Sequence, residues 1–254
     1  MYGNRQDQDP LEWFRQLVGD TDVPARKIRP NRFSITGYVS TTKSDVSQEA
    51  ESSLEHDFLI LLEFDKRVER FLAQPFTLNW EDDEHRSRRY TPDVIVKYAR
   101  LAIRDNPYLR TTLFEVKPRE ILKQKWAEFK PVYRAAMSWA RERDCQFHLV
   151  TEQEIRTDYL VNVKFLLNYR SQFLKGDPVA CGATQAFLLE HLRRLGPSTP
   201  RQLLAAISSD VATQAKYVPW IWNLVLVDEI GIDLTKRLTM ASLIWAKYDR
   251  NSWE

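Results

Sequence analysis

Four ionisable side chains in the first half of the sequence have the types and spacing of a phosphodiester-cutting site. Asp93 follows Pro92 at the start of an apolar segment, and Glu115 and Lys117 come twenty-two and twenty-four residues later. Side chains alternate faces along a strand, so Glu115 and Lys117 point the same way. Glu55 precedes them in a segment with the apolar spacing of a helix. We therefore treat Glu55, Asp93, Glu115 and Lys117 as one candidate catalytic site.

Such a site predicts metal-dependent hydrolysis. Convergent carboxylates are hard oxygen ligands for Mg²⁺, for which Mn²⁺ substitutes. One metal ion can activate water while a second, ~3.5–4 Å away, stabilises the leaving oxygen. Lys117 can orient or deprotonate the water, or neutralise the charge that develops on the phosphate. Glu55 lies at the edge of its helix's apolar stripe, from where it can reach the metals as an extra ligand. The spacing alone also fits carboxylates with a purely structural role.

The elements that must position these residues follow the order helix, three strands, helix, strand. Ser52 or Ser53 can cap a helix, because apolar residues recur after them at helical spacing. Three apolar segments then predict strands: VERFLAQPFTLNW, YTPDVIVKYA and TTLFEVK. A stripe predicts a long helix that Pro131 kinks or splits, and CQFHLVTE predicts a buried strand after it; the stripe consists of Leu122, Trp126, Phe129, Tyr133 and Met137. The acidic run Glu81–Glu84 is typical of a solvated hairpin loop.

This order resembles the restriction-endonuclease-like fold, an α/β fold in which helices flank a mixed sheet. The signature of that fold is Pro-Asp followed by Asp/Glu-x-Lys, which Asp93 and Glu115 to Lys117 match. The resemblance implies that the backbone carbonyl of Val116 is also a metal ligand.

A second, smaller domain is predicted after the turn residues at Gly176–Gly182. Thr184–Leu195 has a helical pattern, Thr199 can cap a second helix with Pro200 in its first turn, and Ala212–Val227 contains a third. Two short strands follow, EIGIDL and RLTMASLIW, and this order is that of a winged helix. We predict a catalytic domain over residues 1–175 with an N-terminal lead-in, and a winged-helix domain over residues 176–254.

Composition and charge bound the class of protein without identifying it. The chain has 254 residues, two cysteines and a formal net charge of +2. We expect a cytoplasmic protein with no membrane span, because no apolar run approaches the ~18 residues that a span needs. Two basic clusters can neutralise phosphates, although solvated loops explain them equally well; they are Arg26, Lys27, Arg29 and Arg32, and Arg86, Arg88 and Arg89.

Four segments carry a closer resemblance, to the TnsA family of heteromeric transposase endonucleases. They are SSLEHDFLILLEFD, FLAQPFTL, YTPDVIV and FEVKPREIL, and the upstream PNRFSITGYVSTTKSDVSQEAESSLE is also similar. The family cuts the non-transferred strand at transposon ends, beside a TnsB-like transposase that cuts and joins the other strand. The resemblance puts the catalytic carboxylates at Glu55 and Asp93 and the catalytic lysine at Lys117. Some relatives have Gln where this chain has Glu115.

Three functions remain open from the sequence. The first is the Mg²⁺-dependent endonuclease acting on double-stranded DNA at transposon ends, with the C-terminal domain contacting a TnsC-like AAA+ ATPase by resemblance. The second is a freestanding nuclease of restriction or repair, which keeps the same site without the partners. The third is a non-catalytic DNA-binding or assembly protein. Because the predicted third helix of the winged helix is mostly apolar, we favour protein contact there over base readout.

Overall fold

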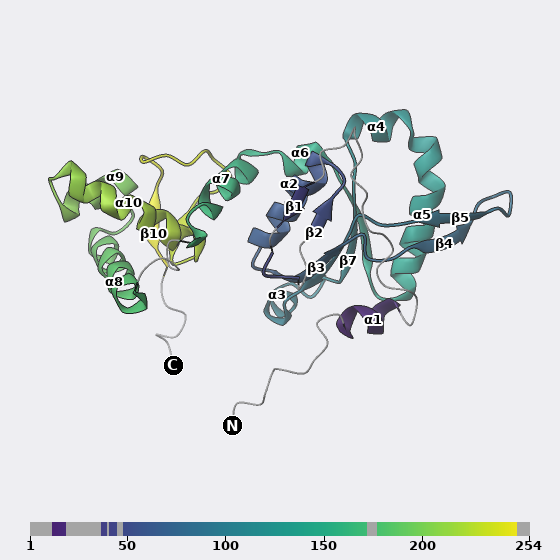
Figure 1. The fold of residues 1–254 in the computed structure, drawn as a ribbon, viewed down its shortest axis with the longest axis horizontal. Coiled ribbons are helices and arrows are strands. Elements are labelled where there is room, and N and C mark those ends of the chain that lie inside the picture. The colour runs from purple at the N-terminus through teal and green to yellow at the C-terminus, as the bar shows by residue number, and fades with distance from the viewer. Residues whose placement is uncertain (1–11, 19–36, 40, 45–47, 172–176, 248–254) are drawn as a thin grey trace, which may run out of the picture. The chain divides into compact units, whose positions relative to one another are not determined.

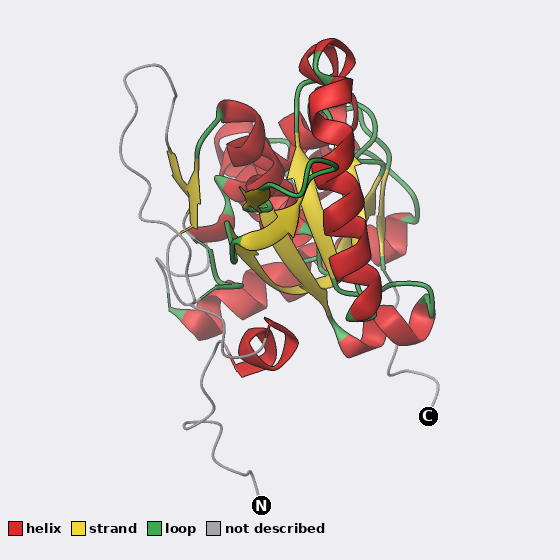
Figure 2. Ribbon diagram, turned by 90° about the vertical axis from the view of Figure 1, so that its right-hand side faces the viewer, coloured by secondary structure: helices red, strands yellow, loops and turns green. Residues whose placement is uncertain are grey.

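A computed structural model describes residues 12–18, 37–39, 41–44, 48–171 and 177–247 (Figures 1 and 2). The chain divides into two compact units, residues 1–155 and 156–254, which we describe separately. The basic cluster at Arg26, Lys27, Arg29 and Arg32 lies outside the described residues, as does much of the segment before Ser52. None of the described helices is both long and apolar enough to cross a membrane.

The first unit is built on a four-stranded mixed sheet with the strand order β3-β6-β7-β8. The strands are β3 (Val68–Ala73), β6 (Val94–Tyr98), β7 (Thr112–Val116) and β8 (Gln146–Val150). The first two pairings are antiparallel and the β7–β8 pairing is parallel. A parallel pair needs a crossover connection, and helices α4 (Arg119–Gln124) and α5 (Trp126–Glu142) supply it. This mixed sheet with flanking helices fits the restriction-endonuclease-like fold.

Helices cover the two faces of this sheet. Helix α2 (Ser53–Phe64) packs on one face, where Phe58 lies 5.1 Å from Phe114 between ring centroids. The opposite face packs against α5 and α1 (Glu12–Val18) in a core that includes Phe14, Ile95, Leu113 and Trp139. Burying each such side chain contributes on the order of 1.5–3 kcal/mol. Alternation along β7 therefore puts Glu115 on the α5 side, because its neighbour Phe114 faces α2.

The local start of α2 agrees with the sequence. Ser52 is the N-cap, and its side chain accepts a hydrogen bond from the Glu55 N–H. Such a cap is worth about 1 kcal/mol. The remaining elements of this unit are β1 (Gly37–Val39), β2 (Gln48–Ala50), α3 (Arg100–Asp105) and α6 (Glu152–Ile155).

The segment VERFLAQPFTLNW is not the single strand that we predicted. Strand β3 ends at Ala73, where Gln74 takes a positive φ of 47° ahead of Pro75. Strand β4 (Leu78–Glu81) pairs instead with β5 (Ser87–Tyr90) in a separate hairpin. Figure 1 shows this hairpin running past α5 with its tip beyond that helix. The acidic run forms the turn as predicted, and Asp82 accepts the backbone N–H groups of residues 84 and 86.

The long helix breaks at a different residue from the one predicted. Lys125 ends α4 and precedes α5, whereas Pro131 lies inside α5. The predicted apolar stripe is also only partly buried, since Tyr133 is 2% exposed while Trp126 and Met137 are 46% and 44% exposed. The buried face of α5 runs instead through Tyr133, Ala136, Trp139 and Ala140.

The described residues of the second unit form four α-helices followed by a strand pair. They are α7 (Asp158–Leu167), α8 (Pro178–Leu195), α9 (Pro200–Ile207), α10 (Val211–Leu226), β9 (Ile230–Ile232) and β10 (Ile244–Ala246). Side chains cap three of the helices at Asp177, Thr199 and Asp210, and Pro200 occupies the first turn of α9. Gly196 ends α8 with φ 72°, a conformation that glycine adopts without steric cost. Trp222 belongs to the core of this unit, because it is 3% exposed.

The division between the units lies at residue 155, ahead of the boundary predicted near Gly176. Helix α7 joins the second unit because its buried Asn162 donates to the carbonyls of Leu234 and Lys236 and accepts the N–H of Leu238. The turn residues from 176 therefore interrupt the second unit rather than separate it from the first.

Candidate active site

The register between β6 and β7 explains why two of the predicted acidic residues meet. Val94 pairs with Phe114 and Ile95 with Leu113 in antiparallel register. Extending this register by one pair puts Asp93 directly opposite Glu115. Opposed residues of an antiparallel pair project to the same face with Cβ atoms about 4.5–5.5 Å apart. The two carboxylates therefore converge where β6 begins and β7 ends.

Lys117 joins these two carboxylates. Its Nζ lies 3.1 Å from Glu115 Oε1 and 3.5 Å from Asp93 Oδ2. The side chains of Glu115, Asp93 and Lys117 are 5%, 12% and 28% exposed, respectively. Three of the four residues proposed from the sequence thus form one cluster, in which a single ammonium lies against two largely buried carboxylates.

The backbone of Val116 also faces this cluster. Its N–H donates a hydrogen bond of 2.7 Å to Asp93 Oδ2. In an antiparallel pair the N–H and C=O of one residue are directed at the same neighbouring strand. The Val116 carbonyl therefore lies on the Asp93 side of β7. The next N–H, that of Lys117, is directed to the other side and donates to the carbonyl of Val150 in β8.

Glu55 does not touch the other three residues. Its Oε2 accepts the N–H of Glu51 at 2.9 Å and its Oε1 accepts the Ser52 hydroxyl at 2.9 Å. Both oxygens thus bind the N-terminus of α2, where a carboxylate also meets the positive end of the helix dipole. The physical reason is that α2 covers the opposite face of the sheet from Glu115. Lys117 and Asp93 nevertheless act electrostatically on Glu55.

Burial and neighbouring charges shift the pKa values of three residues in and around the cluster. Burial, followed by the neighbouring Glu115, holds the pKa of Asp93 well above its ordinary value. Burial also raises the pKa of Glu55. Burial alone would lower the pKa of Lys117, but the carboxylates of Asp93 and Glu115 raise it above its ordinary value. The cluster therefore has more negative than positive groups and keeps its lysine protonated.

Two tyrosines of the site were missed from the sequence. Tyr90, at the end of β5, donates a hydrogen bond of 2.5 Å to Glu115 Oε2. Tyr133, on α5, donates to Glu115 Oε1 at 3.4 Å. Burial and then Glu115 raise the pKa of each tyrosine. The only signal in the sequence was the rule that a buried tyrosine hydroxyl needs a partner, which does not name that partner.

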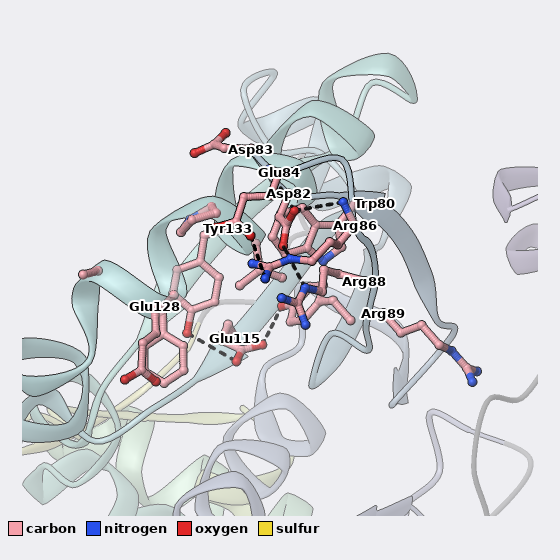
Figure 3. Close-up of a pocket in the computed structure, with 15 residues that line it drawn as sticks. Trp80, Asp82, Asp83, Glu84, Arg86, Arg88, Arg89, Glu115, Glu128 and Tyr133 are labelled. Atoms are coloured by element: carbon pink, nitrogen blue, oxygen red, sulfur yellow. Dashed lines mark hydrogen bonds and ion pairs between the residues drawn. The ribbon is translucent and has the colours of Figure 1, made fainter.

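A pocket of about 620 Å³ opens beside Glu115, between the β4–β5 hairpin and α5 (Figure 3). Figure 3 shows Tyr133 and Glu115 directed toward one another at its base, whereas Arg89 points away. Arg86 and Arg88 line it, and both contact Asp82 through their Nε atoms at 2.9 Å. Glu115 is the residue of the cluster that borders this pocket.

The residues fit a divalent cation whose remaining ligands come from water and the substrate. The donors are carboxylate and carbonyl oxygens, which suit Mg²⁺. Among the residues described by the structure, no three His, Cys, Asp or Glu side chains are grouped so that they could hold a metal ion by themselves. Mg²⁺ beside phosphates is typically held by one or two carboxylates, water and the phosphate oxygens. Asp93 and Glu115, already gathered around the cation of Lys117, match that kind of site.

The fold and this cluster together define a class. A mixed sheet that carries Pro-Asp and Glu-x-Lys on adjacent strands is the arrangement of restriction-endonuclease-like nucleases. Residues 65–152 match the family model described as TnsA-like endonuclease N terminal. The resemblance to the TnsA family is confirmed, and the chain carries a TnsA-like endonuclease domain that includes Asp93, Glu115 and Lys117. No curated protein matches the chain.

Proposed function

We propose that this protein is a Mg²⁺-dependent endonuclease that cuts the non-transferred strand of double-stranded DNA at transposon ends. It acts with a TnsB-like transposase and a TnsC-like AAA+ ATPase. The coarser function, that of a nuclease of Tn7-type transposition, follows from the TnsA-like domain. The single observation that carries the catalytic assignment is the Lys117 ammonium within 3.5 Å of the carboxylates of both Asp93 and Glu115.

The proposed roles follow from the contacts. Asp93 and Glu115 would hold the metal ion, with the Val116 carbonyl as a further ligand. Mg²⁺, when bound, supplies Lewis-acid stabilisation of the phosphate and lowers the pKa of the attacking water. Lys117 lies beside both carboxylates, where it would orient or deprotonate the attacking water, or neutralise the charge that develops on the phosphate. Glu55 contributes negative charge from the end of α2 and would become a ligand only if its carboxylate left the helix cap.

We assign the second unit as a winged helix that contacts a protein partner. Its α8, α9 and α10 precede the antiparallel β9–β10 pair, which is the expected order. Helix α10 has the residues of its C-terminal half buried from Ile221 to Val225, so those residues are unavailable to read bases. Exposed apolar side chains at Val179 and Val211 support protein contact over DNA contact.

Strand-specific cleavage tests the proposed function. A duplex that carries a transposon end, labelled separately on each strand, is incubated with the full chain, with and without the transposase, the ATPase and Mg²⁺. We expect cleavage of the non-transferred strand that requires Mg²⁺ and increases with the partners. Cleavage of plain DNA by the isolated chain would instead favour a freestanding nuclease.

Two variants connect this activity to the cluster. Asp93→Ala and Lys117→Ala should each reduce cleavage at least about 100-fold, because each removes charge that acts on the reacting phosphate. Lys97→Ala is the matched control. The Nζ of Lys97 lies 3.4 Å from a carboxylate oxygen of Glu69, in an ion pair away from the site. Near-normal cutting by a folded Asp93 or Lys117 variant would eliminate the proposed site.

A further inference from the structure

The carboxylate of Glu115 receives hydrogen bonds or ionic contacts from three different elements. Tyr90 from β5 donates to Oε2 at 2.5 Å. Lys117, beyond the end of β7, lies 3.1 Å from Oε1, and Tyr133 from α5 donates to the same oxygen at 3.4 Å. The two oxygens are therefore not equivalent, because Oε2 is held by one short bond and Oε1 faces the cation of the cluster.

The hydroxyl that holds Oε2 is fixed by packing. The rings of Tyr90 and Tyr133 meet edge to face with centroids 6.4 Å apart. Tyr133 in turn stacks on Phe129 at 5.6 Å and lies 5.6 Å from Phe147. A phenol ring has only two side-chain torsions, so the contact with Tyr133, which is itself held by Phe129 and Phe147, restricts where the Tyr90 hydroxyl lies. Glu115 therefore cannot turn its carboxylate without breaking the short bond to Tyr90.

We propose that Tyr90 is a positioning residue that determines which cation the site accepts, by occupying Oε2 so that Glu115 binds through Oε1 alone. The inference rests on the proposed metal-dependent function. Mg²⁺ demands octahedral geometry and takes carboxylates through single oxygens, whereas Ca²⁺ takes more oxygens and often binds both oxygens of one carboxylate. A carboxylate whose Oε2 is held by the short bond from Tyr90, with only Oε1 facing the charged cluster, thus favours Mg²⁺. The β4–β5 hairpin, through its last residue, becomes part of the metal site.

Tyr90→Phe removes this hydroxyl and keeps the ring. Calorimetric titration of the metal-free full chain with Mg²⁺ and with Ca²⁺ measures both affinities without any cleavage. Loss of a hydrogen bond to a ligating carboxylate typically costs 10–100-fold in metal affinity. We expect the Mg²⁺ affinity to fall about 10-fold and the Ca²⁺ affinity to stay equal or rise, so that the ratio of the two falls at least 10-fold.

Tyr98→Phe is the matched control. Tyr98 is a buried tyrosine of β6 in the same sheet, but its hydroxyl bonds to Thr112 instead of a carboxylate. It should leave both cation affinities unchanged. A Tyr90→Phe protein with an unaltered Mg²⁺ to Ca²⁺ ratio would overturn the inference, and so would an equal shift in Tyr98→Phe.

The unaltered chain provides a second measurement that does not depend on the folding of a variant. It should bind Mg²⁺ at least as tightly as Ca²⁺, and a tenfold preference for Ca²⁺ would overturn the inference. The proposed function fails separately, if the unaltered chain binds neither cation and cleaves no DNA. If cleavage requires Mg²⁺ but Tyr90→Phe leaves the ratio of the Mg²⁺ and Ca²⁺ affinities unchanged, the proposed function is retained and the role proposed for Tyr90 is wrong.

Discussion

Replacing Asp93 by Asn tests whether its carboxylate has a functional role or stabilises the fold. Burial, followed by repulsion from Glu115, holds the pKa of Asp93 well above its ordinary value. Asn has nearly the same shape, and its amide oxygen can keep the 2.7 Å hydrogen bond from the Val116 N–H. We therefore expect Asp93→Asn to increase the free energy of unfolding of the metal-free protein while it removes cleavage.

The magnitude follows from linkage between protonation and folding. A raised pKa means that the folded protein favours the neutral form of Asp93. The carboxyl group therefore does not destabilise the fold below its pKa in the unfolded chain, which is about 4. The loss of stability grows as the pH rises from there toward the pKa in the folded protein. Each unit of difference is worth about 1.4 kcal/mol, and buried carboxyl groups can shift by several units. The raised pKa is already a net effect, because it includes the opposing attraction of Lys117 and the hydrogen bond from the Val116 N–H. The expected net gain is roughly 1–3 kcal/mol at neutral pH, and it should disappear near pH 4.

Denaturation by urea in the presence of a chelator measures this difference. Asp82→Asn is the control of opposite sign, because hydrogen bonds from the backbone and side chain of Arg86 hold the pKa of Asp82 below its ordinary value. That change should not stabilise the protein. If Asp93→Asn instead lowered the free energy of unfolding by about 1 kcal/mol or more, the carboxylate would be structural. Such a result would favour the non-catalytic assembly protein.

Two other predictions concern parts of the molecule away from the cluster. Asn162→Ala should lower the free energy of unfolding of the second unit by about 2–4 kcal/mol in urea denaturation, because it leaves the buried carbonyls of Leu234 and Lys236 and the N–H of Leu238 without their partner; a change under 1 kcal/mol would contradict the assignment of α7 to this unit. Burial raises the pKa of the Cys145 thiol to about 11, so alkylation at pH 8 should be roughly 100-fold slower in the folded chain than in denaturant, measured after replacing the other cysteine; equal rates would show that the thiol is exposed.

The residues that meet across β6 and β7 could be predicted because the period of a strand is local. Alternation placed Glu115 and Lys117 on one face, and Pro92 placed Asp93 at a strand's beginning. The caps at Ser52 and Thr199 were equally predictable, since a cap depends on hydrogen bonds within four residues. These features depend on nearest neighbours, and the folded structure keeps them.

The errors and omissions came from contacts between residues distant in sequence. A continuous apolar segment did not reveal that β4 leaves the main sheet after Gln74 to pair with β5. The turn residues at 176 concealed that α7 belongs to the second unit, because Asn162 finds its partners more than seventy positions away.

By itself, the sequence determined the pair Asp93 and Glu115 with its lysine, and the likeness to TnsA endonucleases. Only the tertiary structure decided how those groups are held. The hairpin and α5 brought Tyr90 and Tyr133 to Glu115, whereas the bonds of Glu55 to Glu51 and Ser52 are local to the start of α2. A hydrogen bond depends on distance and direction in space, which residue order fixes only within a helical turn or along a strand.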